Sequence, residues 1–297
     1  MLFLGKKILL MKRTCSSFER CNEPRRTVIE KGGYQILECV YCTHQYCEAR
    51  DAENHLEKVY GDDYFFEGKQ GYPNYLNQRD ILLGYGRKYA KILSKYTEPG
   101  KLLDVGSAAG FILKGFSSAG WERYGLEPNN TMADYGRKEL GLNIRTGGLE
   151  TFETNEKFDV VSIIQVIGHF INLDQAIENI CGLLKPNGLV LIESWDRSSL
   201  VAKMMGKNWH EYSPPSVVNW FNDKTLAQLF NYYGFDLLTK GRPSKRINIQ
   251  HGLSLVDEGM PSFFLKKKML SFFRKTIGKY DVPYPPFDVK WYIFKKH

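Results

Sequence analysis

A run of small residues follows the first apolar strand that the sequence predicts, and its composition suits a ligand lying against the main chain. The run reads Leu102-Leu103-Asp104-Val105-Gly106-Ser107-Ala108-Ala109-Gly110. Glycine permits backbone torsions and a close approach that a Cβ atom would block. A structural turn between a strand and a helix would have a similar composition, so the loop alone leaves both interpretations open.

A second acid, Glu127, ends the next predicted strand, Trp121-Glu-Arg-Tyr-Gly-Leu-Glu127. In nucleotide-binding βαβ units, an acid at about this distance after the glycine loop binds the hydroxyl groups of a ribose. Two cofactors fit this pattern, a nicotinamide dinucleotide and S-adenosylmethionine. Asp104 stands just before the loop, where it would repel a pyrophosphate and attract an amino group, so the pattern favours S-adenosylmethionine.

Short apolar strands alternate with helical patterns around these two acids. Such alternation predicts a parallel α/β sheet that binds ligands at the carboxyl ends of its strands. Gly188 follows a turn and begins the last of the central strands, while helical spacing of apolar residues also marks 78–96. The predicted strands are 101–105, 121–126, 142–146, 158–165, 188–193, 235–239 and 289–294, and the predicted helices are 111–119, 132–140, 173–184 and 224–233.

Cysteines cluster near the amino terminus, where five of the six fall between residues 15 and 47. Cys39-Val-Tyr-Cys42 has the spacing of a zinc knuckle, and Cys15 and Cys21 precede it. Four thiolates bind Zn²⁺ tetrahedrally in structural sites. We therefore predict a structural zinc ion at Cys15, Cys21, Cys39 and Cys42. The first pair is wider than usual, which leaves His44 and Cys47 as substitute ligands and reduced thiols as the other interpretation.

Charge is unevenly distributed along the chain. The 297 residues are 43% hydrophobic and 25% charged, as in folded proteins, and their net charge is +8. Residues 240–297 carry 13 Lys and Arg against four Asp and Glu. The rest of the chain therefore has no basic excess, and a nucleic-acid partner is not favoured. We expect no transmembrane helix, no signal peptide and a cytoplasmic protein.

Pro261–Lys279 has the pattern of an amphipathic helix with a basic face. One interpretation is a helix docked on the rest of the protein with its lysines in solvent. The other is a surface that contacts anionic lipid at the membrane.

The segment DVGSAAGFILKGFSSAGWERYGLEPN resembles the first motif and second strand of class I S-adenosylmethionine-dependent methyltransferases. Residues 158–165 resemble the fourth strand of that family, and 184–193 resemble the approach to its fifth. Tyr34–Cys42 and Asp63–Phe66 resemble a bacterial subgroup with an amino-terminal zinc ribbon. The resemblance implies a Rossmann-like, seven-stranded α/β sheet with helices on both faces, plus a small zinc-ribbon-like segment.

The resemblance also implies roles for individual residues. The methionine part of S-adenosylmethionine would lie against Asp104, Gly106, Ser107, Ala108 and Gly110. Glu127 would hold the ribose hydroxyl groups. Pro128 and Leu149 would flank the adenine. Gln165 and Val166 would close the site at the end of the fourth strand. His169 follows that strand and is the candidate base, although it could equally pack at a helix start.

These inferences predict three segments: a zinc-ribbon-like 1–50, an aromatic linker and helix at 51–99, and a methyltransferase domain at 100–297. Insertions at 196–222 and 243–287 would cover the substrate. Trp209–Pro215 resembles such a covering loop, and Tyr64, Tyr72 and Tyr75 are further candidates for the pocket wall.

The expected acceptor is a small molecule, such as a sugar or a cell-surface polysaccharide precursor. The alternatives are an RNA or protein methyltransferase and a cofactor-binding protein without catalysis.

Overall fold

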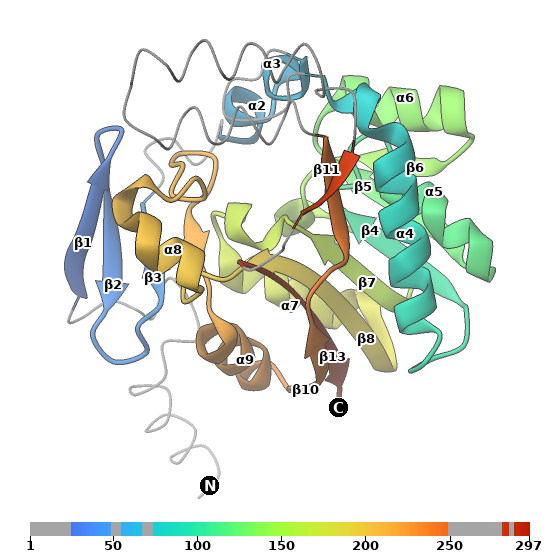
Figure 1. Ribbon diagram of the computed structural model, residues 1–297. Coiled ribbons are helices and arrows are strands. Elements are labelled where there is room, and N and C mark those ends of the chain that lie inside the picture. Colours follow the sequence, from blue (N-terminus) through green and yellow to red (C-terminus); the bar gives the residue numbers. More distant parts are fainter. Residues whose placement is uncertain (1–24, 49–54, 67–73, 249–280, 285–287) are drawn as a thin grey trace, which may run out of the picture.

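The computed structural model describes residues 25–48, 55–66, 74–248, 281–284 and 288–297 (Figure 1). A large twisted sheet forms the centre, and a small sheet from the amino-terminal part lies beside it. Cys15, Cys21, Tyr72 and the predicted helix Pro261–Lys279 fall outside the described residues. No helix in the described parts of the chain is long and apolar enough to cross a membrane.

The central sheet has seven strands in the order β10-β13-β8-β7-β4-β5-β6. The strands β4 to β8 are parallel to one another, whereas β13 is antiparallel to both β8 and β10. All seven strands are close to the positions that the sequence predicts. Their bounds are β4 Lys101–Val105, β5 Glu122–Glu127, β6 Asn143–Thr146, β7 Phe158–Ile164, β8 Leu184–Trp195, β10 Phe235–Gly241 and β13 Val289–Lys296.

Helices cover both faces of this sheet. The inner strands β4, β7 and β8 are largely buried on both faces, so neighbouring residues of one strand enter different cores. Leu103 packs in the core beneath α7 (Leu173–Leu183) and α9 (Asp223–Tyr232). Leu102 packs in the core beneath α4 (Arg79–Leu93), α5 (Phe111–Gly115) and α6 (Asn130–Leu140). The predicted Rossmann-like α/β sheet with helices on both faces is confirmed.

The two main departures from the predicted elements concern the helix 111–119 and strand β8. The predicted helix 111–119 is divided into α5 and a 3₁₀ helix at Phe116–Ala119. Here α5 approaches α4 closely, because a Cβ atom on Gly86 would lie 2.0 Å from the carbonyl oxygen of Ile112. Strand β8 begins before the predicted turn at Gly188, and its register with β7 shifts between Phe158 and Val160.

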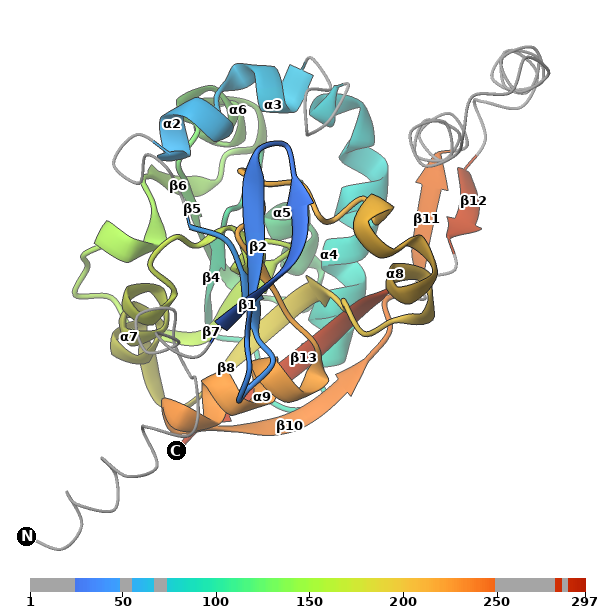
Figure 2. The same ribbon diagram turned by 90° about the vertical axis from the view of Figure 1, so that its left-hand side faces the viewer.

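The small sheet has the order β1-β2-β3-β9. Its strands are β1 Arg25–Lys31, β2 Tyr34–Cys39, β3 Gln45–Tyr46 and β9 Asn219–Trp220. Because β9 lies between β8 and α9 in the sequence, it joins the amino-terminal strands to the main domain. Figure 2 shows β1 and β2 in front of the central sheet. The remaining elements are α2 His55–Val59, α3 Asp62–Phe66, α8 Leu200–Met205, β11 Lys245–Asn248, β12 Asp281–Tyr284 and the 3₁₀ helices Tyr75–Gln78, Leu149–Thr151, Ile167–His169 and Gly206–Asn208.

Candidate active site

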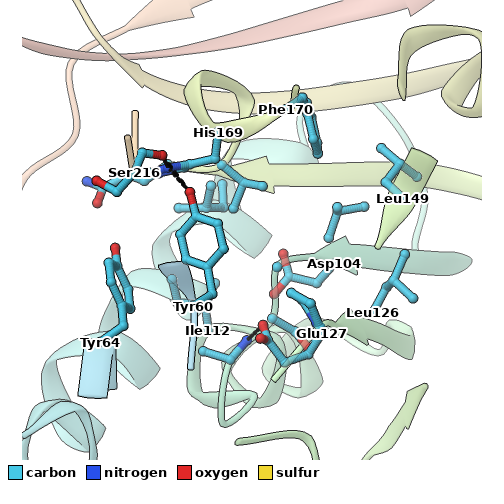
Figure 3. A pocket seen from close by; sticks show the side chains of 18 of the residues that line it. Tyr60, Tyr64, Asp104, Ile112, Leu126, Glu127, Leu149, His169, Phe170 and Ser216 are labelled. Atoms are coloured by element: carbon cyan, nitrogen blue, oxygen red, sulfur yellow. Dashed lines mark hydrogen bonds between the residues drawn. The ribbon is translucent and has the colours of Figure 1, made fainter. Parts of the chain in front are cut away.

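A cavity of about 370 Å³ lies at the carboxyl ends of the central strands (Figure 3). This size falls within the range of small-molecule sites. The segments 55–66 and 209–217 form its outer wall. All the predicted cofactor-binding residues line it except Gly110, and His169 lines it too; the lining set is thus Asp104, Gly106, Ser107, Ala108, Glu127, Pro128, Leu149, Gln165, Val166 and His169.

Asp104 lies near the carboxyl end of β4, and its side chain is buried. The Ser162 hydroxyl on neighbouring β7 donates a hydrogen bond of 2.6 Å to Asp104 Oδ1. Burial raises the pKa of Asp104 to about 7, and the hydrogen bond from Ser162 opposes that shift. Asp104 is therefore a carboxyl group whose charge depends on what occupies the cavity.

Glu127 is the last residue of β5 and is also buried. Its two carboxylate oxygens accept hydrogen bonds from the backbone N–H groups of Ala108 and Asn129, each at 2.8 Å. Ala108, whose N–H contacts Glu127, has a left-handed φ of 46°. Burial raises the pKa of Glu127 to about 7, partly offset by these two hydrogen bonds.

The two carboxyl groups fit a cationic ligand with hydroxyl groups. Neither Asp104 nor Glu127 forms an ion pair within the described residues. A buried carboxylate without a cationic partner is unfavourable, and a positive ligand would relieve that cost. The site therefore has the donor set that an amino group and a ribose require.

Gly110 has a different place from the other predicted residues, because it does not line the cavity. It is the residue before α5, with a φ of 79°. A Cβ atom there would lie 2.4 Å from Leu142 Cδ1 and 3.0 Å from Ile144 Cδ1. Gly110 thus lets the loop turn into α5 close to the start of β6.

The candidate base His169 ends a short 3₁₀ helix that follows β7. Its Nδ1 atom lies 2.6 Å from the carbonyl oxygen of Ser216 and 2.8 Å from the hydroxyl oxygen of Tyr60. Burial lowers the pKa of His169, whereas the carbonyl groups of Ser216 and Gln165 oppose the shift. The ring is therefore neutral near pH 7 and able to accept a proton.

Two functional candidates were missed by sequence reasoning. Tyr60 reaches His169 across more than a hundred residues of sequence, and no local pattern predicts that contact. Glu193 is buried at the cavity wall, accepting hydrogen bonds from Gln165 Nε2 at 2.8 Å and from the Tyr89 hydroxyl. A signal for Glu193 was present, because it lies near the end of a central strand as Asp104 and Glu127 do.

The predicted covering loop contributes His210, Glu211 and Ser213 to the cavity wall. Tyr64 and Tyr75 also line the cavity, as the sequence suggested. The loop is attached to the small sheet, because Tyr212 donates a hydrogen bond of 2.7 Å to Gln45 Oε1. The amino-terminal strands thereby help to hold one wall of the cavity.

Two of the four predicted zinc ligands, Cys39 and Cys42, lie within the described residues. Cys39 ends β2, and both Cys39 and Cys42 are buried in a tight turn. The His44 N–H donates to Cys42 Sγ at 3.3 Å. No group of three or more His, Cys, Asp or Glu residues suited to a metal ion occurs within the described ranges. The two substitute ligands contact other groups. His44 Nε2 lies 3.1 Å from Asn219 Oδ1, and Cys47 Sγ lies 4.0 Å from the Val217 carbonyl oxygen.

A family model described as a methyltransferase domain matches residues 76–240, which is more than half of the chain. The chain belongs to this family, and it is an S-adenosylmethionine-dependent methyltransferase. The expected enzyme class is thereby confirmed.

Two relatives share the name ubiquinone biosynthesis O-methyltransferase. The protein from Actinobacillus pleuropneumoniae is 29% identical over 167 residues, covering 47% of this chain and 71% of the relative. The protein from Rickettsia prowazekii is 34% identical over 143 residues, covering 41% of this chain and 56% of the relative. The second match thus spans little more than half of the relative.

Solved structures share the fold at low sequence identity. The magnesium protoporphyrin IX methyltransferase of Synechocystis superposes with a TM-score of 0.52 at 13% identity, covering 81% of this chain and all of that one. A possible histamine N-methyltransferase from Thermotoga maritima gives a TM-score of 0.51 at 15% identity, covering 82% and 99%. These likenesses support the fold alone.

Proposed function

We propose that the protein transfers a methyl group from S-adenosylmethionine to a small-molecule acceptor, with a sugar or a cell-surface polysaccharide precursor as the first class to test. The observation that carries this proposal is the pairing, in one cavity of about 370 Å³, of two buried carboxyl groups with a neutral histidine. The names of the two relatives also support a small-molecule acceptor.

The sheet order supports a role for each end of the cavity. Asp104 and Glu127 lie at the carboxyl ends of the adjacent strands β4 and β5, so we place the amino group of the cofactor at Asp104 and its ribose at Glu127. Pro128 and Leu149 then flank the adenine. The acceptor lies over β7 and β8, on the other side of β4.

S-adenosylmethionine supplies an electrophilic methyl group on a positively charged sulfur. The protein positions the acceptor for in-line attack on that methyl group. Where the acceptor atom carries a proton, His169 receives it.

Titration calorimetry tests the cofactor assignment. We expect the protein to bind S-adenosylmethionine and its product S-adenosylhomocysteine, and to bind NAD far more weakly, because Asp104 would repel a pyrophosphate. Tight NAD binding without S-adenosylhomocysteine binding would overturn the assignment.

Cofactor affinity should depend on pH through the two carboxyl groups. The free protein has a pKa of about 7 at both Asp104 and Glu127. An amino group and hydroxyl donors bind the ionised forms, so their pKa values fall on binding. Affinity for S-adenosylhomocysteine therefore rises with pH and levels off above about pH 7. Each carboxyl group that must ionise contributes up to about tenfold in Kd per pH unit below its pKa.

Calorimetry at about pH 6 and about pH 8 measures this slope. Asp104→Asn should make the dependence shallower, and Glu122→Gln, an exposed change on the neighbouring strand β5, should not. A Kd that is the same at both pH values in the wild-type protein would contradict the raised pKa values.

We also propose one structural zinc ion per chain, held by Cys39 and Cys42 together with Cys15 and Cys21. The buried knuckle and its N–H to sulfur contact support this ligand pair. Structural zinc sites contribute about 10–16 kcal/mol of apparent binding free energy in small peptides. Elemental analysis should find one zinc per chain and none in Cys39→Ser. Protein purified without chelator that holds no zinc would contradict this proposal.

A further inference from the structure

Tyr60 lies between α2 and α3, in a segment that contributes no strand to the central sheet, yet it contacts the candidate base directly. Its hydroxyl oxygen is 2.8 Å from His169 Nδ1 and 2.5 Å from the carbonyl oxygen of Ser216. The two rings meet edge to face at 90°, with centroids 5.5 Å apart. Figure 3 shows the three groups converging at one wall of the cavity.

Hydrogen-bond donors and acceptors fix the proton positions in this triad. The Ser216 carbonyl oxygen can only accept, so the Tyr60 hydroxyl donates to it. His169 Nδ1 also lies within 2.6 Å of that oxygen, and an unprotonated nitrogen there would place two lone pairs face to face. Nδ1 therefore carries the proton, and the Tyr60 oxygen supplies a second acceptor beside it. Nε2 is then the unprotonated ring nitrogen, and we assign it as the base.

The same segment is attached to the cofactor side of the cavity. The Asn129 side-chain amide donates to the Tyr60 carbonyl oxygen and to Asp62 Oδ1, each at 3.0 Å. The Thr131 hydroxyl donates to Asp62 Oδ2 at 3.1 Å. Since the Asn129 backbone N–H donates to Glu127, a continuous set of contacts connects Glu127 to His169.

We propose that Tyr60 is a positioning residue, which holds the His169 ring with its proton on Nδ1, and that Asn129 and Asp62 keep Tyr60 in place. Cofactor contacts at Glu127 thereby support the geometry of the base at the other end of the cavity. The inference rests on the proposed role of His169 in methyl transfer.

The surroundings of Tyr60 do not favour its ionisation, so Tyr60 does not act as a base in place of His169. Burial raises the pKa of Tyr60 well above its ordinary value, and Tyr64, Glu211 and Glu150 raise it further. The hydroxyl is therefore protonated throughout the neutral range, and it acts as a hydrogen-bonding group and not as a second base.

Ring ¹⁵N chemical shifts of histidine test this proposal on the intact protein without any acceptor. The chain has six histidines, and the His169 signals are assigned by their loss in His169→Gln. Wild-type protein should show His169 mainly as the tautomer protonated at Nδ1. Tyr60→Phe keeps the ring but removes the second acceptor beside Nδ1, so the Nε2-protonated share should rise even though the Ser216 carbonyl oxygen still accepts from Nδ1. Tyr64→Phe, the same change at the neighbouring ring, should leave the His169 signals as they are.

Asp62→Ala tests the attachment of the segment. We expect the His169 tautomer to shift in the same direction as in Tyr60→Phe, and to a smaller extent because Asn129 still contacts the Tyr60 carbonyl group. An unchanged tautomer ratio in Tyr60→Phe overturns the proposal. Calorimetry with S-adenosylhomocysteine on the same samples separates this result from a failure of the proposed function, because that function requires binding whichever tautomer is present.

Discussion

Replacing Glu127 with Gln should weaken the binding of S-adenosylmethionine and S-adenosylhomocysteine by about 10- to 100-fold. Hydrogen bonds to a charged group contribute about 1.5–3 kcal/mol, and each 1.4 kcal/mol is about tenfold in affinity. The substitution removes the charge that we assign to the ribose hydroxyl groups. It also replaces one oxygen that accepts a backbone N–H. Calorimetry with S-adenosylhomocysteine gives the ratio of dissociation constants directly.

The matched control is Glu122→Gln on the same strand, where the carboxylate is exposed. It should leave the dissociation constant unchanged. A thermal melt of each variant shows whether the loop at Ala108 has been disturbed. If folded Glu127→Gln binds S-adenosylhomocysteine as tightly as wild type, the ribose lies elsewhere.

Replacing His169 with Gln should lower the turnover of methyl transfer by about 100- to 10,000-fold, the usual contribution of a general base. Cofactor affinity should stay close to that of wild type, because we place His169 on the acceptor side. Turnover is measured as S-adenosylhomocysteine formed with an extract that contains the acceptor. Since burial lowers the pKa of His169, wild-type turnover should decline only as the pH falls below the ordinary histidine value of 6.5.

The exposed terminal His297→Gln is the control for the loss of a histidine. It should retain full turnover. If His169→Gln keeps wild-type turnover, another group receives the proton or none is needed, and His169 is a packing residue.

The central sheet could be predicted well because its signals are local. Strands β4, β7 and β8 are largely apolar runs, and such runs are buried on both faces in a parallel sheet. Asp104 and Glu127 are acids near the carboxyl ends of predicted strands, which is how both could be placed in the site from sequence. An acid at the end of the second strand is the group that binds ribose hydroxyls in such folds, so the position of Glu127 in the sequence also indicates its role.

The outer wall could not be predicted in the same way. Tyr60 meets Ser216 through a hydrogen bond between segments 156 residues apart, and neither segment has a periodic pattern that fixes its place. The pairing of β3 with β9 is likewise long-range, joining Gln45 to Trp220 over two residues per strand. Such contacts depend on packing that forms only after the central sheet is built.

Transfer of an isotope-labelled methyl group tests the central claim most directly. The protein is incubated with methyl-labelled S-adenosylmethionine and an extract of its native cells, and the products are separated by ultrafiltration. The account predicts label in a small molecule that passes the membrane, in amounts that fall strongly with Glu127→Gln and with His169→Gln. Label retained in protein or RNA, or no labelled product from protein that binds S-adenosylhomocysteine, would contradict methyl transfer to a small molecule.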